Sequence, residues 1–350
     1  MRLANWFSVL GLASLSMACA ARKPPPPAAP PISNATPELR AAVEKASACN
    51  YDAGRFDAEC EGYKAWEANT ELANAGLLEM MTSEDTKVRA LVVRKLSVQY
   101  TTDNADKDSL ASYLTAAEKE KVEPIAKDFA RGIAHIDLGK FELLDRGIAI
   151  AKAHSVADYQ ETFASALKSE SEPDKVVAYA GELAKSEDLA LRNAALRMFV
   201  DATKSRGEAA CAGIDALRKD KDAPLAQHAT THLAHASACA TQHDALLALI
   251  DEMKLPKNPA SAEPYVGEVV QGICENEGKT PAQRDRSLAL AKQITETTKI
   301  QGATRSSTLA AVLACDPKGG PAYVKKFSKD KDTVVAERAK SLLEGAATKK

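Results

Sequence analysis

The sequence predicts an all-α protein, an α-solenoid of stacked antiparallel helix pairs, on three observations. An acidic turn followed by a helical apolar run occurs four times along the chain. The distances between these copies are close to multiples of one period. No segment shows the strict apolar–polar alternation between hairpin turns that predicts strands. The four copies are residues 82–96, 186–196, 220–233 and 330–342.

Each copy carries an aspartate at the same position, followed three positions later by an apolar residue. The aspartates are Asp85, Asp188, Asp222 and Asp332, and the intervals between them are 103, 34 and 110 residues. These intervals approximate three, one and three copies of a unit of roughly 34–37 residues, a period typical of helical-repeat arrays. An aspartate at this turn can accept hydrogen bonds from the free amides of the next helix, which stabilises that helix by about 1 kcal/mol. We therefore expect the four aspartates to occupy equivalent corners.

The composition excludes some classes of protein. The 350-residue chain is 45% hydrophobic, which is enough for a large core. Only 5% of the residues are aromatic, and alanine is abundant, which suits short helices that cross closely. The formal net charge is −2, and no long basic block is present, so we expect no nucleic-acid partner.

The first residues are typical of an export signal. Arg2 precedes the apolar segment 6–15, which is too short to span a membrane. Ser16-Met17-Ala18-Cys19 is similar to a bacterial lipobox, although such boxes usually carry leucine where Ser16 stands. In this interpretation residues 1–18 are removed and Cys19 becomes a lipidated N-terminus. In the alternative, an ordinary A-x-A site is cut after Ala20 and the protein is soluble in the periplasm or secreted.

Residues 19–37 form a Pro/Ala-rich tether that includes the run PPPPAAPP. Such a segment is a semi-rigid spacer of about 3.1 Å per residue, which suits a folded part held away from a membrane. We therefore expect a lipoprotein of the bacterial cell envelope, anchored in the outer membrane and facing the periplasm. Residues 38–350 form the folded body, with an N-terminal cap region at 38–81 and a C-terminal cap helix at 333–350.

Apolar residues at spacings of three and four predict the helices of the body. Thr36 and Pro37 mark the first start, Ile125 and Phe129 lie on one apolar stripe, and Pro173 begins a later helix. Residues 101–112 are polar and are expected to form a loop. The expected helices are 37–48, 63–81, 82–100, 116–136, 141–153, 156–167, 174–185, 186–196, 208–217, 224–238, 245–253, 265–274, 306–315 and 333–346.

The seven cysteines contain no CxxC motif, so neither a zinc ribbon nor a thioredoxin-type site is expected. Setting Cys19 aside leaves six, which could form three disulfides in an oxidising compartment. Two of them enclose a short loop, and two others end helices at equivalent positions of neighbouring units. Six cysteines allow fifteen pairings. The pairing we predict is Cys49–Cys60, Cys211–Cys239 and Cys274–Cys315.

The repeated motif resembles a HEAT repeat of the short bacterial kind, with the pattern D-x-x-V-R-x-x-A. The first two copies match it best, and the last two have alanine, Ala226 and Ala336, in place of the arginine. The matching residues are Asp85, Val88 and Arg89; Asp188, Leu191, Arg192 and Ala195; Asp222, Leu225 and Ala229; Asp332, Val335 and Ala339. The resemblance implies an α-solenoid whose concave face binds protein, and it implies no single activity.

One set of residues could hold a metal. His228, His232 and His235 share one face of the expected helix 224–238, with Cys239 four residues further on, and imidazoles at positions i and i+4 can bind zinc, nickel or copper. The other interpretation is a polar helix edge that carries histidines by chance. A metal site that included Cys239 would also compete with the Cys211–Cys239 disulfide.

No pattern indicates catalysis. Gly278-Lys279-Thr280 matches the end of a phosphate-binding loop, but the leading glycine is misplaced and no strand precedes it. HExxH, GxSxG and a GxGxxG that opens a helix are all missing. We therefore expect a non-catalytic scaffold without a cofactor, which binds protein partners through the concave face. The alternative is a periplasmic transition-metal-binding protein that uses His228, His232 and His235.

Overall fold

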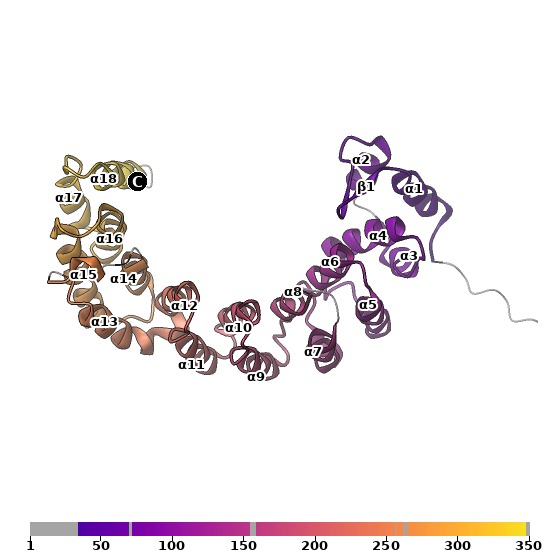
Figure 1. The fold of residues 1–350 in the computed structure, drawn as a ribbon, viewed down its shortest axis with the longest axis horizontal. Coiled ribbons are helices and arrows are strands. Elements are labelled where there is room, and N and C mark those ends of the chain that lie inside the picture. The colour runs from indigo at the N-terminus through magenta and orange to yellow at the C-terminus, as the bar shows by residue number, and fades with distance from the viewer. Residues whose placement is uncertain are drawn as a thin grey trace, which may run out of the picture. The chain divides into compact units, whose positions relative to one another are not determined.

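The computed structural model describes residues 34–69, 72–154, 159–255, 257–261, 263 and 265–347, and the statements below concern these residues. They form an all-α protein with one short hairpin, β1 Tyr51–Asp52 and β2 Arg55–Phe56 (Figure 1). Three 3₁₀ helices lie between the α-helices, η1 Leu138–Phe141, η2 Ser237–Gln242 and η3 Pro259–Ser261. The α-helices are α1 Pro37–Ser47, α2 Glu61–Ala68, α3 Asn74–Met80, α4 Thr86–Gln99, α5 Lys107–Lys119, α6 Glu123–Ile133, α7 Leu144–Ala153, α8 Tyr159–Ala166, α9 Pro173–Leu183, α10 Leu189–Ala202, α11 Gly207–Leu217, α12 Ala223–His235, α13 His243–Glu252, α14 Tyr265–Glu275, α15 Pro281–Glu296, α16 Gly302–Cys315, α17 Gly320–Lys325 and α18 Thr333–Ala347.

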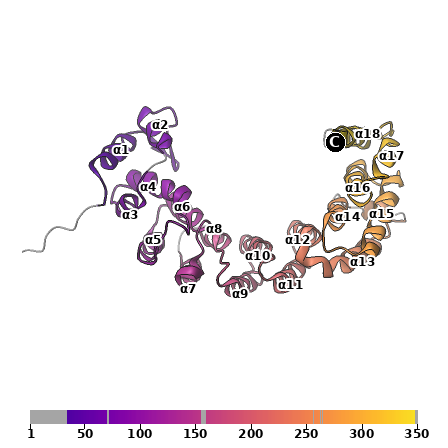
Figure 2. The ribbon, with the colours of Figure 1, turned by 180° about the vertical axis from the view of Figure 1, so that it is seen from behind.

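From α3 onward the helices form pairs, α3 with α4, α5 with α6, and so on to α17 with α18. Every second helix of a pair also contacts the second helix of the next pair, so that α4, α6, α8, α10, α12, α14, α16 and α18 form one row (Figures 1 and 2). The first helices contact one another less extensively. The predicted stack of helix pairs is therefore confirmed.

The four motif aspartates occupy equivalent corners, as predicted. Each is the residue before a second helix, and its carboxylate accepts a hydrogen bond from an amide of that helix's first turn. Asp85 precedes α4, Asp188 precedes α10, Asp222 precedes α12 and Asp332 precedes α18. These helices belong to the first, fourth, fifth and eighth pairs, which accounts for intervals close to three, one and three units.

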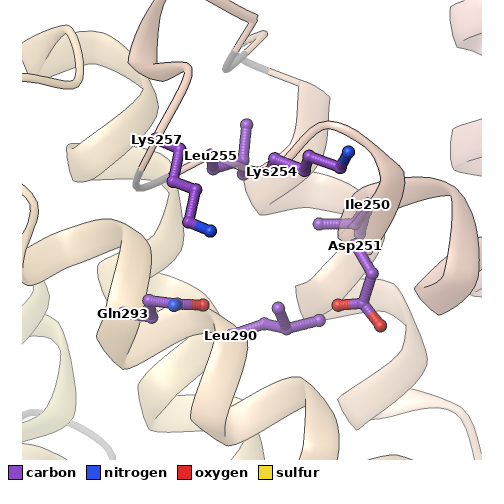
Figure 3. A pocket seen from close by; sticks show the side chains of 7 residues that line it. All are labelled: Ile250, Asp251, Lys254, Leu255, Lys257, Leu290 and Gln293. Atoms are coloured by element: carbon purple, nitrogen blue, oxygen red, sulfur yellow. The ribbon is translucent and has the colours of Figure 1, made fainter.

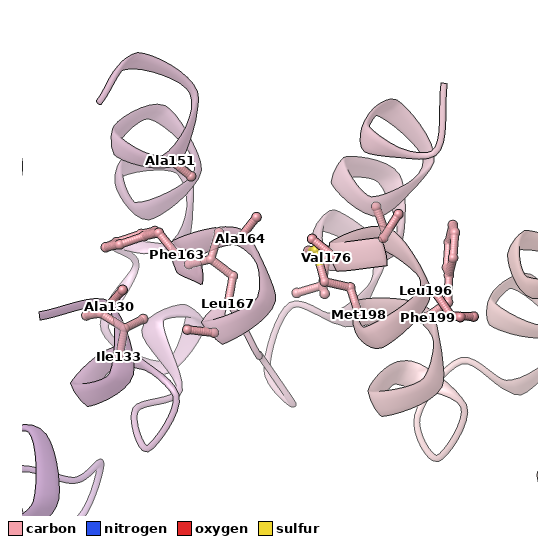
Figure 4. Packing of buried hydrophobic residues seen from close by; sticks show 14 of the residues in the cluster. Ala130, Ile133, Ala151, Phe163, Ala164, Leu167, Val176, Leu196, Met198 and Phe199 are labelled. Atoms are coloured by element: carbon pink, nitrogen blue, oxygen red, sulfur yellow. The ribbon is translucent and has the colours of Figure 1, made fainter. Parts of the chain in front are cut away.

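The apolar core continues from pair to pair because small residues let the helices approach closely. In Figure 4, Phe163 and Ala164 of α8 lie between the neighbouring α6 and α7, which contribute Ile133 and Ala151. The next layer contains Met198 and Phe199 of α10, and all these side chains are buried. A single pair could not bury these faces, so its stability depends on its neighbours.

Buried or partly buried ion pairs join successive second helices at three places, and we call these pairs the arginine–acid links. Each arginine lies in the first turn of one second helix, and the acid lies just before the next second helix. The links are Arg89 to Glu120, at 2.9 Å, Arg192 to Asp220, at 2.8 Å, and Arg305 to Asp330, at 2.7 Å. Each arginine also donates to one or two backbone carbonyls of its own helix pair. Its guanidinium group therefore bonds to its own pair and to the next pair at the same time.

The links set the pKa of each acid. Burial alone would raise the pKa of Glu120, but hydrogen bonds from Arg89 and from the amides of Val122 and Lys121 lower it overall. The same balance lowers the pKa of Asp220, where the amide of Asp222 and Arg192 outweigh burial. A buried carboxylate that keeps its charge requires this full set of donors.

Several expected helix boundaries were wrong. The single helix 63–81 is two helices, α2 and α3, and the amine of Lys95 donates to the carbonyls of Glu67 and Asn69 where α2 ends. The single helix 116–136 is likewise divided between α5 and α6, because Pro124 cannot continue a helix and instead lies in the first turn of α6. Glu120, after the end of α5, pairs with Arg89. Half of the expected loop 101–112 is helical, since Asp106 caps α5 with bonds to two amides.

One helix and one hairpin were missed. Helix α15 was not predicted, although Thr280 and Gln283 form a capping box at its start. The hairpin has strands of two residues, which is too short for any alternation to show. Its turn residues Ala53 and Gly54 both have positive φ, 46° and 82°, as a two-residue type I′ turn requires. Gly54 also packs against Pro124, where a Cβ would have no room.

Three disulfides are present, and they are the three pairs that the sequence predicted. Cys49–Cys60 closes the loop that contains the hairpin, and its Cα atoms are 6.0 Å apart. Cys211–Cys239 joins α11 to η2, and Cys274–Cys315 joins α14 to α16. Disulfides of this number are typical of an oxidising, exported environment. Within the described ranges no helix is long and apolar enough to cross a membrane.

The links predict which arginines matter for stability. Arg192→Met leaves the carboxylate of Asp220, 9% exposed, buried without its partner. We expect the free energy of unfolding to fall by about 3–5 kcal/mol, measured by urea denaturation. The control Arg197→Met removes the half-exposed pair with Glu161 and should cost about 0–1 kcal/mol. Equal losses in the two variants would contradict the role given to the links.

Candidate functional site

The exposed side of the second-helix row is a surface to which several consecutive repeats contribute. We call it the second-helix face. Helical spacing of three and four residues leaves one edge of each second helix exposed or half-buried, while the other edges pack in the core. Its residues include Arg94, Val98, Lys127, Arg131, Glu161, Ser165, Asn193, Arg197, His228, His232, His235, Glu268, Gln271 and Glu275.

Contacts between neighbouring helices hold this face in register. Arg197 of α10 pairs with Glu161 of α8 and donates to the hydroxyl of Ser165 at 3.1 Å. Lys168, after α8, pairs with Asp201 of α10 at 3.1 Å. These exposed pairs add little stability. Their positions show that side chains from consecutive repeats meet on one surface.

The charge of the second-helix face changes along the row. Its α4 and α6 part carries Arg94, Lys127 and Arg131, the last two in ion pairs with acids of α6. Its α14 part carries Glu268 and Glu275. Since the whole chain has a net charge of only −2, this separation of charge is local. A surface of this kind can orient a partner and discriminate between partners.

A pocket of about 730 Å³ lies where the hairpin meets α4 and α6, and we call it the hairpin pocket. Its lining is Ala53, Gly54, Arg55, Phe56, Ala58, Tyr63, Arg94, Glu123, Pro124, Lys127, Asp128 and Arg131. The aromatic part is ordered, because Phe56 stacks on Tyr63 with ring centroids 5.2 Å apart and contacts Tyr51 at 4.6 Å. Burial raises the pKa of Asp128, although Arg131 and Arg94 act to lower it.

A second pocket of about 400 Å³ lies between α13 and α15 (Figure 3). Ile250, Leu255 and Leu290 form its apolar part, and Lys254, Lys257 and Gln293 stand at its edge. The remaining polar side chain, Asp251, is paired with Arg286 of α15. The lining residues therefore form no pair of nucleophile and base within this pocket.

The structure keeps the three predicted histidines on α12 but separates Cys239 from them. Helix α12 ends at His235 and not at residue 238, so Cys239 leaves the face of the three histidines; it lies in η2, fully buried and bonded to Cys211. In the part of the chain that is described, no group of three or more His, Cys, Asp or Glu side chains could hold a metal ion. The metal-binding alternative therefore gains no support from the geometry.

The three histidines instead form a polar edge of the second-helix face. The ring of His235 covers Gly272 of α14 so closely that a Cβ there would clash, and its Nδ1 lies 3.8 Å from Glu275. Partial burial, and then the neighbouring His228 and His235, lower the pKa of His232.

Two buried polar residues were missed by the sequence reasoning. The amide of Asn276, at the end of α14, donates to the carbonyls of Ala234 and Ala236 and lies 3.3 Å from His243 Nε2. His243 is fully buried at the start of α13. This network joins the fifth and sixth pairs, where no arginine–acid link was found. The only sequence signal was a lone asparagine directly after a helix.

The other residues considered in the sequence have clear positions. Gly278, Lys279 and Thr280 lead into α15, where the amide of Gly278 and the amine of Lys279 both bond to Asn276. Cys19, the expected lipidation site, and the expected signal peptide lie outside the described residues, as does most of the tether.

No protein-family model matches the sequence, and a search of curated proteins finds no match. Among solved structures, a crystal structure of an engineered protein is 15% identical, covers 88% of this chain and 84% of its own, and has a TM-score of 0.38. Two further engineered proteins are 15% and 14% identical, each match covering 78% of this chain and 95% or 97% of the other, with TM-scores of 0.26 and 0.27.

The burial of His243 predicts a dependence of stability on pH. Burial lowers the pKa of His243 below the value of about 6.5 that an unfolded histidine has. As the pH falls below 6.5, the unfolded chain therefore takes up a proton that the folded chain does not, and the stability present above that pH is lost. Urea midpoints measured from about pH 7.5 to about pH 5.5 should fall less in His243→Gln than in the unchanged protein. Parallel pH profiles would contradict this.

Proposed function

We propose that the protein is a non-catalytic lipoprotein of the bacterial envelope that binds protein partners through its second-helix face. The observation that carries this proposal is the row of second helices, in which each contacts the next and exposes one polar edge. A partner lying along such a row meets side chains from many repeats, so affinity comes from extended area and not from one pocket.

The composition of the face supports binding over catalysis. It presents charged and amide side chains, with single apolar residues such as Val98, 74% exposed. Buried links fix the spacing of the helices below it, so little ordering is needed when a partner binds. The HEAT-like pattern of the sequence points to the same kind of function.

The lipid anchor is supported by the sequence at residues 16–19 and by the proline-rich segment that follows. Three disulfides agree with an exported protein. In this proposal acyl chains on Cys19 hold the protein at the outer membrane, and the tether positions the folded part in the periplasm.

Site-specific photo-crosslinking in the native envelope tests the binding face. A photoreactive residue at Asn193 or Gln271, on second helices α10 and α14, should capture the same protein partner. The matched controls are Ala212 of α11 and Ala289 of α15, which are exposed on first helices. Capture of one partner only from the second-helix positions supports the proposal. Equal capture from all four positions, or none, would contradict it.

Metabolic labelling with a fatty-acid analogue tests the anchor. The unchanged protein should incorporate the label and fractionate with membranes, because a lipidated Cys19 carries acyl chains that partition into a bilayer. Cys19→Ser should lose the label. If both proteins are labelled to the same extent, Cys19 is not the site of lipidation.

A further inference from the structure

The hairpin pocket contains an excess of positive charge that is built into the fold. Two of its four cations are neutralised locally: Lys127 pairs with Glu123 at 2.7 Å, and Arg131 pairs with Asp128 at 2.5 Å. Within the described residues the guanidinium groups of Arg55 and Arg94 donate no hydrogen bond and form no ion pair, although Arg94 is near enough to Asp128 to lower the pKa of that carboxyl. Two guanidinium groups from different elements, β2 and α4, therefore line one pocket without a carboxylate at ion-pair distance.

Arg55 is held by a rigid support. The Cys49–Cys60 disulfide closes the loop, and Arg55 lies opposite Asp52 in the register of the two antiparallel strands. Gly54 of the turn rests on Pro124 of α6. On the other side, the amine of Lys87 in α4 donates to the carbonyl of Cys49 at 2.8 Å, which joins α4 to the base of the loop. The position of Arg55 relative to Arg94 is therefore fixed by covalent and packing constraints.

We propose that the hairpin pocket binds a carboxylate side chain in an acidic segment of a partner protein. Arg55 and Arg94 donate to the carboxylate, for which the planar guanidinium is well matched. Apolar residues next to that acid pack on the rings of Phe56 and Tyr63. This inference rests on the proposed function, since it names the chemistry by which the α4 and α6 end of the second-helix face recognises a partner.

The lining favours a peptide carboxylate over a phosphate or a lipid headgroup. Glu123 and Asp128 also face the pocket and would repel a doubly charged phosphate more strongly than a singly charged carboxylate. The aromatic rings offer apolar area that an inorganic anion cannot use. A volume of about 730 Å³ accommodates several side chains of an extended segment.

Fluorescence anisotropy tests the proposal with the purified full-length protein and a fluorescein-labelled peptide of alternating glutamate and leucine. We expect the peptide to bind, and Arg94→Glu or Arg55→Glu to weaken the affinity at least about tenfold. The control is Arg338→Glu on α18, where an exposed arginine without a described partner undergoes the same change of net charge. It should alter the affinity less than about twofold. Arg94→Lys keeps the charge but loses the planar guanidinium group that can donate two parallel hydrogen bonds, so its loss of affinity should lie between those of the other two variants.

The result that overturns the proposal is equal weakening by Arg94→Glu and Arg338→Glu, which would show only non-specific attraction. Failure of the acidic peptide to bind, or equal binding of a lysine–leucine peptide, also overturns it. So does displacement of the peptide by inorganic phosphate, or by phosphatidylglycerol vesicles, at lower concentrations than by unlabelled peptide. Circular dichroism of each variant checks that the fold is retained. Crosslinking from Asn193 and Gln271 reports the proposed function separately, since neither residue lies in the hairpin pocket.

Discussion

The arginine–acid link between successive second helices is the interaction on which the rest of this architecture depends. Short helices expose more apolar surface than one pair can bury, so each pair must lie against the next. The desolvation cost of burying the ion pair of Arg192 with Asp220 is offset because both side chains form further hydrogen bonds. Arg192 donates to two backbone carbonyls, and the amide of Asp222 donates to Asp220. A buried pair with this complete set of bonds fixes one register between the repeats.

At two joints without such a link, other groups connect the neighbouring pairs. Between the fifth and sixth pairs the joint contains Asn276 and His243, and between the sixth and seventh pairs it contains the Cys274–Cys315 disulfide. Each device fixes the distance between neighbouring second helices by a different chemistry. The common result is a row whose exposed edges remain aligned, which is the property that a docking surface requires. The hairpin pocket adds a local, charged site at the N-terminal end of the same row of helices.

The sequence predicted much of the fold because its strongest signals are local. Asp85, Asp188, Asp222 and Asp332 cap helices directly, so their spacing reports the repeat without any tertiary information. The disulfide pairs followed from the short loop between Cys49 and Cys60 and from equivalent helix ends.

Most of the failures have tertiary causes, but one is local. The expected helix 116–136 contains Pro124, which lies in the first turn of α6, and Glu120 before it binds Arg89 of the preceding pair. Arg305 forms a third link, although its helix follows Gln301 and not an aspartate, so the motif did not reveal it. The hairpin pocket collects Arg55, Arg94 and Arg131 from segments far apart in the chain, and no pattern in the sequence joins them. His235 and Cys239 separate because η2 begins where the helix was expected to continue.

The most direct test of the linked row is hydrogen–deuterium exchange measured along the chain of an Asp220→Asn variant. This change removes the charge that Arg192 binds while keeping the shape of the side chain. If pairs are held by their neighbours, the rate of amide exchange should rise in α10 and α12. In the more distant helices, toward α4 and toward α18, the rate should equal that of the unchanged protein. An even rise across all the helices, or no change in α10 and α12, would contradict the account.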